Sequence, residues 1–439
     1  MLSILPNILF VLLCCIGIGF FVKNVQKLLR NIRLAQPVNT SGNQKERWKR
    51  MALLSLGQTK LTIRPIAGLL HIFVYLGFII INIEIIEILI DGIFGTHRVF
   101  RVLGNFYNFL IGSFEILAIL VILSVIIFWI RRNLIQLQRF QKKELNGKPK
   151  NDANIILYAE FIMMSLFLLM NAADFKLQTL GVHSYPIAGS FPISQYLSPI
   201  LPNNIFTLIG IERISWWLHI TGIFIFMNYL FYSKHLHILL AFPYTYYSNV
   251  QPKGELNNLD SVTKEVKAML DPNNDPFAVV DNENETPTFG ASDVFNLSQT
   301  QILGAYACTE CGRCTDECPA NLTGKLLSPR KIMMDTRDRT EEIGSNIDKN
   351  GAFIDDNKKL LDNYISREEI WACTTCNACV EACPMEINPL SIIIDLRRYL
   401  VMEESSSPAS LTKMMTNIEN TNSPWAYNPQ ERTNVFKEI

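Results

Sequence analysis

Two copies of one cysteine pattern lie in the C-terminal half of the chain. Each has the spacing C-x2-C-x2-C-x3-C-P, in which three closely spaced thiolates bind one [4Fe–4S] cluster and the fourth reaches across to a second cluster. This crossing rule predicts two clusters with the following ligands: Cys308, Cys311, Cys314 and Cys383 for cluster 1, and Cys373, Cys376, Cys379 and Cys318 for cluster 2. Structural zinc uses two C-x2-C pairs and has no role for a third cysteine two residues further on. Disulfides belong in oxidising compartments, and the topology predicted below places these cysteines in the cytoplasm.

The amino-acid composition divides the chain into two parts. Residues 1–248 hold nearly all the long apolar runs and are basic, with 22 Lys and Arg against 10 Asp and Glu. Residues 249–439 are polar and acidic, with 18 against 30, so the net charge of zero hides two opposite halves. We predict a transmembrane domain over 1–248, a linker over 249–300, a two-cluster domain over 301–404 and a tail over 405–439.

Five apolar segments of the first part are each close to the ~20 residues that cross a bilayer as a helix. The predicted spans are 5–22, 66–90, 104–130, 155–172 and 214–242. Lys and Arg are concentrated in the connections that follow the first and third spans, which places the N-terminus outside and the cluster domain in the cytoplasm. The first span lacks a basic start and a cleavage site, so we expect it to remain as an anchor rather than to be removed as a signal peptide.

The cluster domain is predicted to be helical rather than a compact ferredoxin. The two motifs are 54 residues apart, counted between Cys318 and Cys373, and Ser328-Pro329 and Asn388-Pro389 each predict the start of a helix. No glycine-rich phosphate-binding motif is present, and nothing in the chain predicts a nucleic-acid partner.

Histidines in the apolar spans form a second group with chemical potential, because ionisable side chains inside a membrane are costly and usually functional. His71 lies early in the second span and His237 late in the fifth, so both are expected near the cytoplasmic face. We predict that they bind a haem b iron from its two sides. The alternative is a pair of hydrogen-bonded interior histidines. Gly68, one turn before His71, is expected to leave room for the flat macrocycle.

Helical geometry orients the other histidines of the fifth span. At 100° per residue, the 18 positions between His219 and His237 make five turns, so both point the same way about 27 Å apart, while His235 points almost oppositely. Lys234 is expected either to neutralise a haem propionate or to extend to the membrane interface.

These segments resemble known families. Trp216–Ile238, with the residues around His71, resembles the cytochrome b membrane subunits related to the gamma subunit of respiratory nitrate reductase. The two cysteine motifs resemble iron–sulfur subunits related to heterodisulfide reductase, and the fusion resembles electron-transfer flavoprotein:menaquinone oxidoreductases. The resemblance covers residues 1–400. It implies an all-α fold, with a five-helix cytochrome b-like bundle followed by an α-helical ferredoxin domain, in the cytoplasmic membrane of a bacterium.

The chain departs from these families at two places. The nitrate reductase relatives place a second histidine in the second span where this chain has Ile81 and Asn82, so His219 lacks its expected partner. Either His97 or His183 supplies one, or the chain binds a single haem. The cysteine-rich CCG modules of heterodisulfide reductase relatives are also missing. We therefore expect the two-electron chemistry on a partner, either a cytoplasmic CCG-type iron–sulfur subunit or an electron-transfer flavoprotein.

The predicted function is electron transfer between that partner and menaquinone or another quinone in the lipid, through the two clusters and haem b. Glu84, Glu87 and Asp91 lie on one face of the second span, where carboxylates could exchange protons with the quinone. The alternative for these three is a solvated helix end. The alternative function is a membrane scaffold whose clusters are structural and which docks a catalytic complex.

Overall fold

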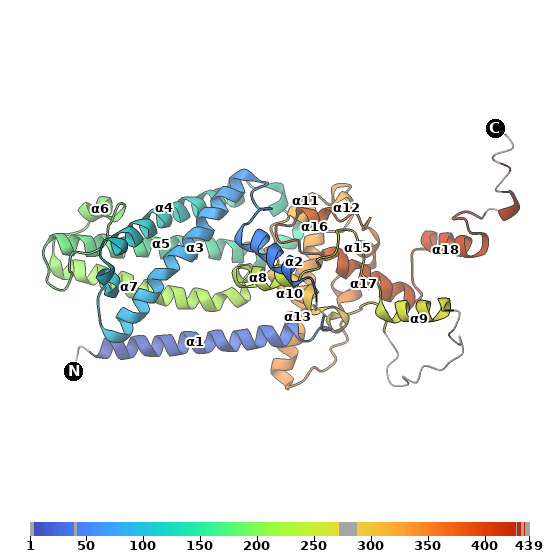
Figure 1. Cartoon of the computed structure of the whole chain (residues 1–439), viewed down its shortest axis with the longest axis horizontal. Coiled ribbons are helices and arrows are strands. Elements are labelled where there is room, and N and C mark those ends of the chain that lie inside the picture. Colours follow the sequence, from blue (N-terminus) through green and yellow to red (C-terminus); the bar gives the residue numbers. More distant parts are fainter. Residues whose placement is uncertain (1–3, 39–41, 272–287, 427, 432–433, 435–439) are drawn as a thin grey trace. The chain divides into compact units, whose positions relative to one another are not determined.

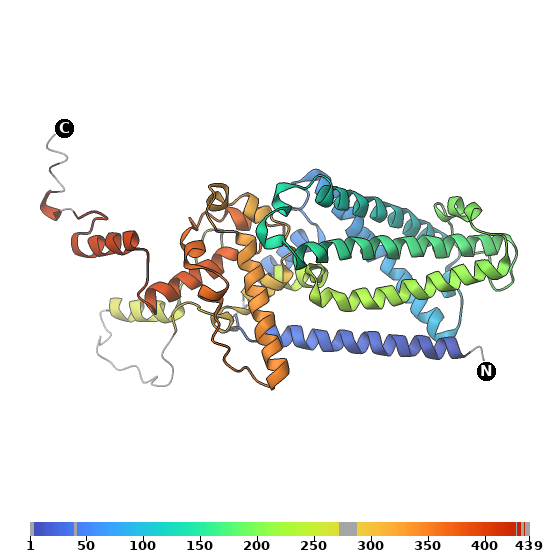
Figure 2. The same ribbon diagram turned by 180° about the vertical axis from the view of Figure 1, so that it is seen from behind.

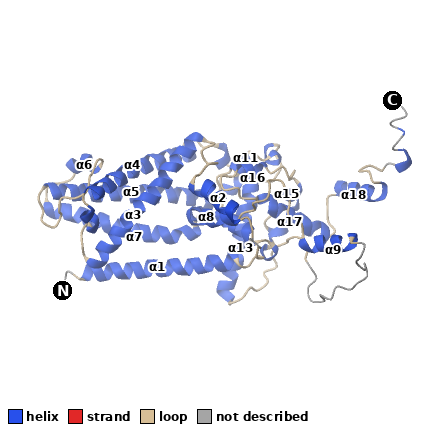
Figure 3. Ribbon diagram, viewed as in Figure 1, coloured by secondary structure: helices blue, strands red, loops and turns tan. Residues whose placement is uncertain are grey.

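The computed structural model describes the chain except for residues 1–3, 39–41, 272–287, 427, 432–433 and 435–439. It is 71% helical, and the described residues contain no strand, so the predicted all-α class is confirmed. Figure 3 shows helices and loops alone in the described part.

The chain forms two compact units. The first contains the described residues up to Asn31, Gly42–Ser248 and Tyr306–Gly312. The second contains the described residues of Ile32–Ser41, Asn249–Ala305 and Arg313–Ile439. The short segment Tyr306–Gly312 thus belongs to the first unit although it follows the expected linker and lies within the expected cluster domain, and it carries the first two cysteines of the first motif.

Five long helices build the first unit and run side by side in Figures 1 and 2. They are α1 (Leu5–Ile32), α3 (Pro65–Phe94), α4 (Asn105–Asn133), α5 (Lys148–Thr179) and α7 (Ile205–Tyr229). Shorter helices are α2 (Gln44–Met51), the π-helical turn Ala52–Leu56, α6 (Ser194–Leu197) and α8 (His237–Tyr247). Single 3-10 turns occupy Val99–Leu103, Gln138–Phe140, Lys143–Leu145, Ser198–Ile200, Leu230–Tyr232 and Lys234–Leu236.

Apolar side chains from all five long helices meet in one core, and others face outward. Phe10 of α1 packs on Trp216 of α7 with ring centres 5.3 Å apart. Glycines allow the closest crossings, because a Cβ at Gly77 would meet Val121 at 2.5 Å and one at Gly92 would meet the Phe10 ring at 2.5 Å. The outward face of α1 is strongly apolar (Ile8, Leu9, Leu12 and Ile16), as a helix that faces lipid requires.

Five helices of the described chain are long and apolar enough to cross a membrane, which confirms the predicted number. Several helices extend beyond the predicted apolar cores, because their polar ends remain helical. The fifth differs more: it begins at Ile205, where Asn204 accepts a hydrogen bond from the Thr207 backbone, rather than at 214. It ends at Tyr229, and Ser233 has extended backbone angles (φ −126°, ψ 149°), so 214–242 is not one straight helix.

The second unit is a set of mostly short helices. They are α9 (Asp260–Leu270), α10 (Gln299–Ala307), α11 (Arg313–Asp316), α12 (Pro319–Leu322), α13 (Pro329–Asn350), α14 (Leu360–Asn363), α15 (Arg367–Trp371), α16 (Ala378–Ala382), α17 (Pro389–Met402) and α18 (Ala409–Thr421), with 3-10 turns at Val294–Asn296 and Pro429–Glu431. Both predicted helix starts are confirmed. Ser328 accepts a hydrogen bond from the Lys331 backbone, and Asn388 accepts one from the Ser391 backbone.

Part of the expected linker belongs to the core of the second unit. Ala291, Val294 and Leu297 are fully buried, and the guanidinium of fully buried Arg339 donates to Asp293 at 2.8 Å. Arg339 also donates to Asp356 at 2.6 Å, so one side chain ties three segments together. These bonds fix α13, the long helix between the two cysteine motifs. The Ala291 N–H donates to the Asp395 carbonyl of α17 at 2.9 Å and so links the same segment to the helix that follows the second motif.

Candidate functional site

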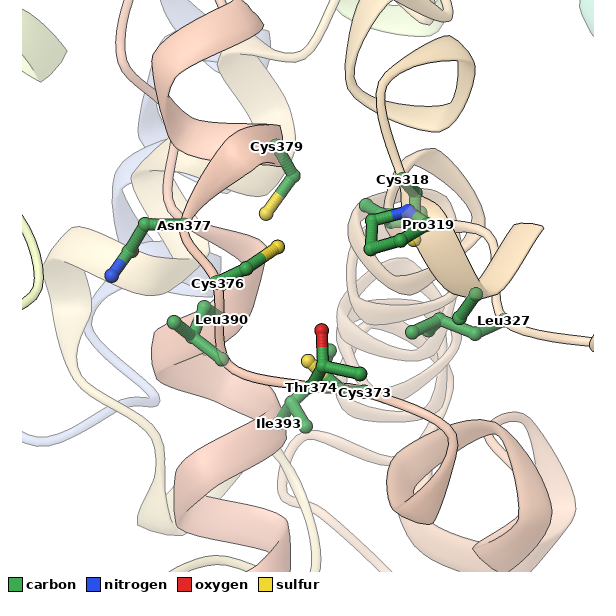
Figure 4. Close-up of a pocket in the computed structure, with 12 residues that line it drawn as sticks. Cys318, Pro319, Leu327, Cys373, Thr374, Cys376, Asn377, Cys379, Leu390 and Ile393 are labelled. Carbon is green, nitrogen blue, oxygen red and sulfur yellow. The ribbon is translucent and has the colours of Figure 1, made fainter. Parts of the chain in front are cut away.

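A pocket of the second unit is lined by cysteines from both motifs. Cys318 of the first motif lies with Cys373, Cys376 and Cys379 of the second, and the rest of the wall is mainly apolar, from Pro319, Ala320, Leu327, Pro329, Leu390 and Ile393. Figure 4 shows Cys376 and Cys379 on one side of the pocket and Cys318 across from them. The structure thus brings together the four residues that the crossing rule predicts for cluster 2.

Local signals position these cysteines. Ser366 and Glu369 form a capping box that starts α15, and this helix ends at Trp371, two residues before Cys373. The Arg397 guanidinium donates to the carbonyl oxygens of Ile370 and Cys373, at 2.7 and 2.5 Å, and holds this end of the loop. Thr375 has a left-handed backbone (φ 57°), and its N–H donates to Cys373 Sγ at 3.4 Å. The loop therefore turns sharply and directs an N–H group at sulfur.

The donor set of this pocket fits an iron–sulfur cluster. Burial raises the pKa of the Cys373 thiol, and burial raises that of Cys379 to about 12. Such thiols bind metal as thiolates, so loading with cationic iron would release protons. Among the described residues, no three His, Cys, Asp or Glu side chains are grouped closely enough to hold one metal ion. The four thiolates of a [4Fe–4S] cluster bind four different iron atoms, so a wider spacing suits them.

The cysteines predicted for cluster 1 are divided between the two units. Cys308 and Cys311 belong to the first unit, while Cys314, on α11, and Cys383, just after α16, belong to the second. Glu310, between the first two cysteines, is buried and has a left-handed backbone (φ 55°). It forms an ion pair with Lys234.

The rings of His71 and His237, the predicted haem ligands, lie near each other in the first unit. Their ring centres are 6.3 Å apart and the rings are tilted by 46°. Imidazole nitrogens bind zinc at about 2.0–2.1 Å and iron at similar lengths, so two rings on opposite sides of one metal ion have centres roughly 6 Å apart. The observed spacing therefore fits one iron ion between the two rings.

The hydrogen bonds of the two rings also fit metal ligation. His71 Nδ1 lies 3.0 Å from Gln58 Oε1, and His237 Nδ1 lies 3.1 Å from the Lys234 carbonyl oxygen. Both partners accept hydrogen bonds, so each Nδ1 carries the proton and each Nε2 keeps the lone pair that a metal needs. Gly68 has a different role from the expected one, because a Cβ there would meet the Thr62 backbone at 2.9 Å. A close approach of the preceding loop, not a macrocycle, accounts for this glycine.

The helix break after Tyr229 overturns the predicted directions of the histidines in span five. His235 does not point away from His237: the two rings stack with centres 5.6 Å apart. His235 Nε2 lies 3.6 Å from Glu160 Oε1 on α5. His219 and His237 are on different helices, so the expected 27 Å separation along one helix does not apply.

The structure does not bring the proposed partners of His219 to it. His219 Nδ1 lies 3.0 Å from the Met163 carbonyl oxygen, beside the Phe167 ring. His97 instead lies 3.6 Å from Asp174, which is seven residues, or about 10 Å, further along α5 than Phe167. His183 is exposed in the loop before α6.

Glu84 and Glu87 are buried, at 3% and 4% exposure, so the solvated alternative is wrong for both. Glu87 accepts hydrogen bonds from the Phe100 backbone at 2.8 Å and from the Tyr107 hydroxyl at 2.9 Å. Among the described residues, Glu84 Oε2 is buried with no hydrogen-bond partner.

These two carboxyls belong to a larger buried group, the Arg98 cluster, which consists of Glu84, Glu87, Arg98, Tyr107, Glu115, Asn171 and Asp174. Arg98 donates to Tyr107 at 3.1 Å, to Asn171 at 2.8 Å and to Asp174 at 2.5 Å. Asn171 donates in turn to Glu115 at 3.1 Å. Arg98, Glu115 and Asp174 are not among the predicted site residues. Glu115 is charged and lies inside the predicted span 104–130, whereas Arg98 and Asp174 lie outside the predicted spans.

Comparisons with known proteins agree with the cluster motifs. Residues 307–387 match the family described as 4Fe-4S dicluster domain. A probable iron–sulfur-binding oxidoreductase FadF of Bacillus subtilis is 28% identical, over 97% of this chain and 60% of that protein. An EtfAB:quinone oxidoreductase of Syntrophomonas wolfei is 26% identical, over 85% and 51% respectively.

A shorter relative matches the C-terminal part. A subunit of the ferredoxin/F(420)H(2)-dependent CoB-CoM heterodisulfide reductase of Methanosarcina acetivorans is 32% identical, over 26% of this chain and 56% of that protein. The predicted resemblance to flavoprotein:quinone oxidoreductases and heterodisulfide reductase subunits is confirmed. The chain spans only 60% and 51% of the two longer relatives. No solved structure matches it.

Proposed function

We propose that this chain is a membrane iron–sulfur oxidoreductase that passes electrons between a cytoplasmic redox partner and the quinone pool. Two [4Fe–4S] clusters and one haem b carry the electrons, with the ligand sets predicted from the sequence. A bound cluster or haem exchanges one electron at a time, and the protein binds these groups, spaces them and shields them from water.

One observation carries the proposal: the neighbouring His71 and His237 rings, 6.3 Å apart, belong to the same unit as Cys308 and Cys311. A metal-binding pair in the five-helix unit and the beginning of a cluster motif are therefore parts of one folded body. A scaffold with structural clusters has no need for two neighbouring imidazoles whose Nδ1 atoms are both hydrogen-bonded to acceptors.

The Arg98 cluster supports a place for proton exchange. Four carboxyls, those of Glu84, Glu87, Glu115 and Asp174, accompany one buried cation, Arg98. An uncompensated buried charge is expensive inside a membrane, so this excess of acids marks a functional rather than a structural group. We propose that Glu84 and Glu87 exchange protons with the quinone, because quinol oxidation releases two protons with its two electrons.

The partner and the location complete the proposal. The relatives' names include an EtfAB:quinone oxidoreductase and a heterodisulfide reductase, so an electron-transfer flavoprotein or a CCG-type iron–sulfur subunit is the partner that fits. The basic connections after α1 and α4 favour a bacterial cytoplasmic membrane with the N-terminus outside and the clusters inside.

Redox difference spectra of the purified protein test the proposal. We expect a b-type haem absorbance that is reduced by a menaquinol analogue, and two [4Fe–4S] signals by electron paramagnetic resonance (EPR). If the clusters are present but no haem absorbance responds to quinol, the scaffold alternative holds. Purification at low salt in mild detergent should retain the partner, and salt should loosen it, because the cluster half is acidic.

A further inference from the structure

Lys234 lies three residues before His237 and links it to neighbouring segments of the first unit. Its backbone carbonyl accepts the hydrogen bond from His237 Nδ1 at 3.1 Å, and its backbone N–H donates to Asp152 at 3.1 Å. Its ammonium group donates to the Pro149 carbonyl at 2.8 Å, forms the ion pair with Glu310 and lies 3.9 Å from Asp152. The ammonium group thus has two hydrogen-bond acceptors and a further carboxylate nearby within the protein, so this lysine does not extend to the membrane interface as one expected role required.

Glu310 brings the first cysteine motif into this arrangement. It lies between Cys308 and Cys311, and its side chain is 2% exposed where it meets Lys234, itself 10% exposed. The same segment is fixed at its other end, because Asn31 of α1 donates to the Tyr306 hydroxyl at 3.0 Å. Tyr306–Gly312 is therefore held at two points of the first unit.

A comparison with the second motif shows that the turn between the first two cysteines does not need a carboxylate. Thr375 occupies the same place, two residues after the first cysteine, and has the same left-handed backbone, with φ 57° against 55° for Glu310. Thr375 is exposed and, within the part of the chain that the structure describes, has no lysine partner, so the turn around a cluster forms without a carboxylate. The carboxylate of Glu310 must have another role, and its contact with Lys234 indicates which.

Stability alone is a weak explanation for the pair. Removing two charges from water costs about as much as their attraction returns, so a buried ion pair adds little net stability, and fixed registry is its better-attested use. Here Glu310 belongs to the loop that carries Cys308 and Cys311, and the carbonyl of Lys234 orients the ring of His237. The connection runs from Cys311 through Glu310 and Lys234 to His237 Nδ1.

We propose that the Lys234–Glu310 pair holds the Cys308–Cys311 loop at a fixed distance from His237, so that both residues are positioning residues for electron transfer between the groups that the loop and His237 would bind. This inference rests on the function proposed above. In this transfer the reduced cluster would give up one electron and the haem iron would take it up. Electron tunnelling weakens exponentially with distance, so a loop that moves slows the transfer even when both cofactors stay bound.

The test uses the full chain, purified with both clusters and haem, and compares wild type with Glu310→Gln and Lys234→Met. Rapid mixing with dithionite, followed at the haem absorbance, gives the rate of haem reduction. A Cys308→Ser variant gives the background of direct reduction. We expect both variants to keep the haem spectrum and both cluster EPR signals, while the haem is reduced about tenfold more slowly or worse, the size typical for losing an outer-shell partner.

Two further variants separate positioning from a loss of folding. The exchange Lys234→Glu with Glu310→Lys restores a pair with reversed charges and should recover most of the rate. Glu381→Gln is the matched control. Glu381 lies within the second motif and also pairs with a lysine, Lys253, but its side chain is 60% exposed, so this pair should fix little. It should reduce its haem at the wild-type rate.

The inference is overturned if Glu310→Gln, with all cofactors present, reduces its haem as fast as wild type. It is also overturned if the double variant Lys234→Glu with Glu310→Lys reduces its haem as slowly as the single variants do. This second outcome decides the inference even if Glu310→Gln loses cluster 1. Wild-type protein that carries clusters but no haem would instead contradict the proposed function, and the cofactor analysis detects this before any rate is measured.

Discussion

The two cysteine motifs have the same spacing but different surroundings. In the first, Glu310 is buried and paired with Lys234, and the Cys308–Cys311 loop belongs to the five-helix unit. In the second, Thr375 and Cys376 are exposed, and the whole motif belongs to the second unit. A repeated ligand pattern thus has two environments: the first motif has a buried, charge-paired loop, and the second has an exposed one. Under the proposed function, this difference favours cluster 2 as the contact with a soluble partner and cluster 1 as the contact with the haem.

The largest effect is expected from a change in crossed ligation, in which each motif supplies its fourth cysteine to the other cluster. Cys318→Ser removes a sulfur from the pocket of Cys373, Cys376 and Cys379, so the second cluster should be lost and the iron content should fall by about half. EPR of the reduced protein identifies the lost centre, and Cys15→Ser, in the exposed face of α1, is the control. Loss of cluster 1 with cluster 2 intact would contradict crossed ligation.

The proposed haem site is the next target. His71→Ala and His237→Ala should each abolish the same b-type absorbance, because each removes one of the two proposed ligands. His235→Ala should keep it, since His235 Nε2 lies beside Glu160. Pyridine haemochrome analysis measures the haem content. If His237→Ala kept its full haem content and His235→Ala lost it, His235 rather than His237 would be the ligand.

Glu84, the proposed proton acceptor in quinol oxidation, should give a smaller effect, which is on a rate and not on cofactor content. Glu84→Gln should slow haem reduction by a menaquinol analogue by about 100-fold, the range of a lost proton-transfer group, and leave dithionite reduction unchanged. Glu46→Gln, on exposed α2, is the control. Equal rates of quinol oxidation in Glu84→Gln and wild type would remove Glu84 from the proton path.

The sequence predicts best what depends on short spacing or on length. The cysteine sets could be predicted because each motif is local, and the five helices because each apolar run is long. The break after Tyr229 could not, because residues 230–242 continue the apolar run and only the extended backbone at Ser233 ends the helix. The Lys234–Glu310 pair could not either, since its partners are 76 residues apart and meet only through the tertiary fold.

The smallest expected effect concerns α13, the helix between the two motifs. Burial raises the pKa of Asp335 to about 6, despite its 2.7 Å ion pair with Lys331. The folded protein thus binds this proton more tightly than the unfolded chain, and the resulting stability is full below about pH 4 and lost as the pH rises through 6. Relative to Asp335→Asn, the unfolding free energy of wild type should fall by about 2 kcal/mol between pH 4 and pH 7.

Urea unfolding followed by circular dichroism, on the full chain in detergent, measures this difference. Asp338→Asn is the control on the same helix, because its carboxyl is half exposed. A constant difference between wild type and Asp335→Asn across this pH range would show that Asp335 does not titrate differently in the folded state.

The place of Tyr306–Gly312 in the first unit also bears on biogenesis. The ribosome completes Gly42–Ser248, with Lys234, His71 and His237, before it reaches Glu310. Because domains generally fold as they emerge, N-terminal part first, the partner for Glu310 exists before Glu310 is made. The Cys308–Cys311 loop can therefore take its place only on a five-helix unit whose residues are already made, so faults in that unit are passed on to the first cysteine motif.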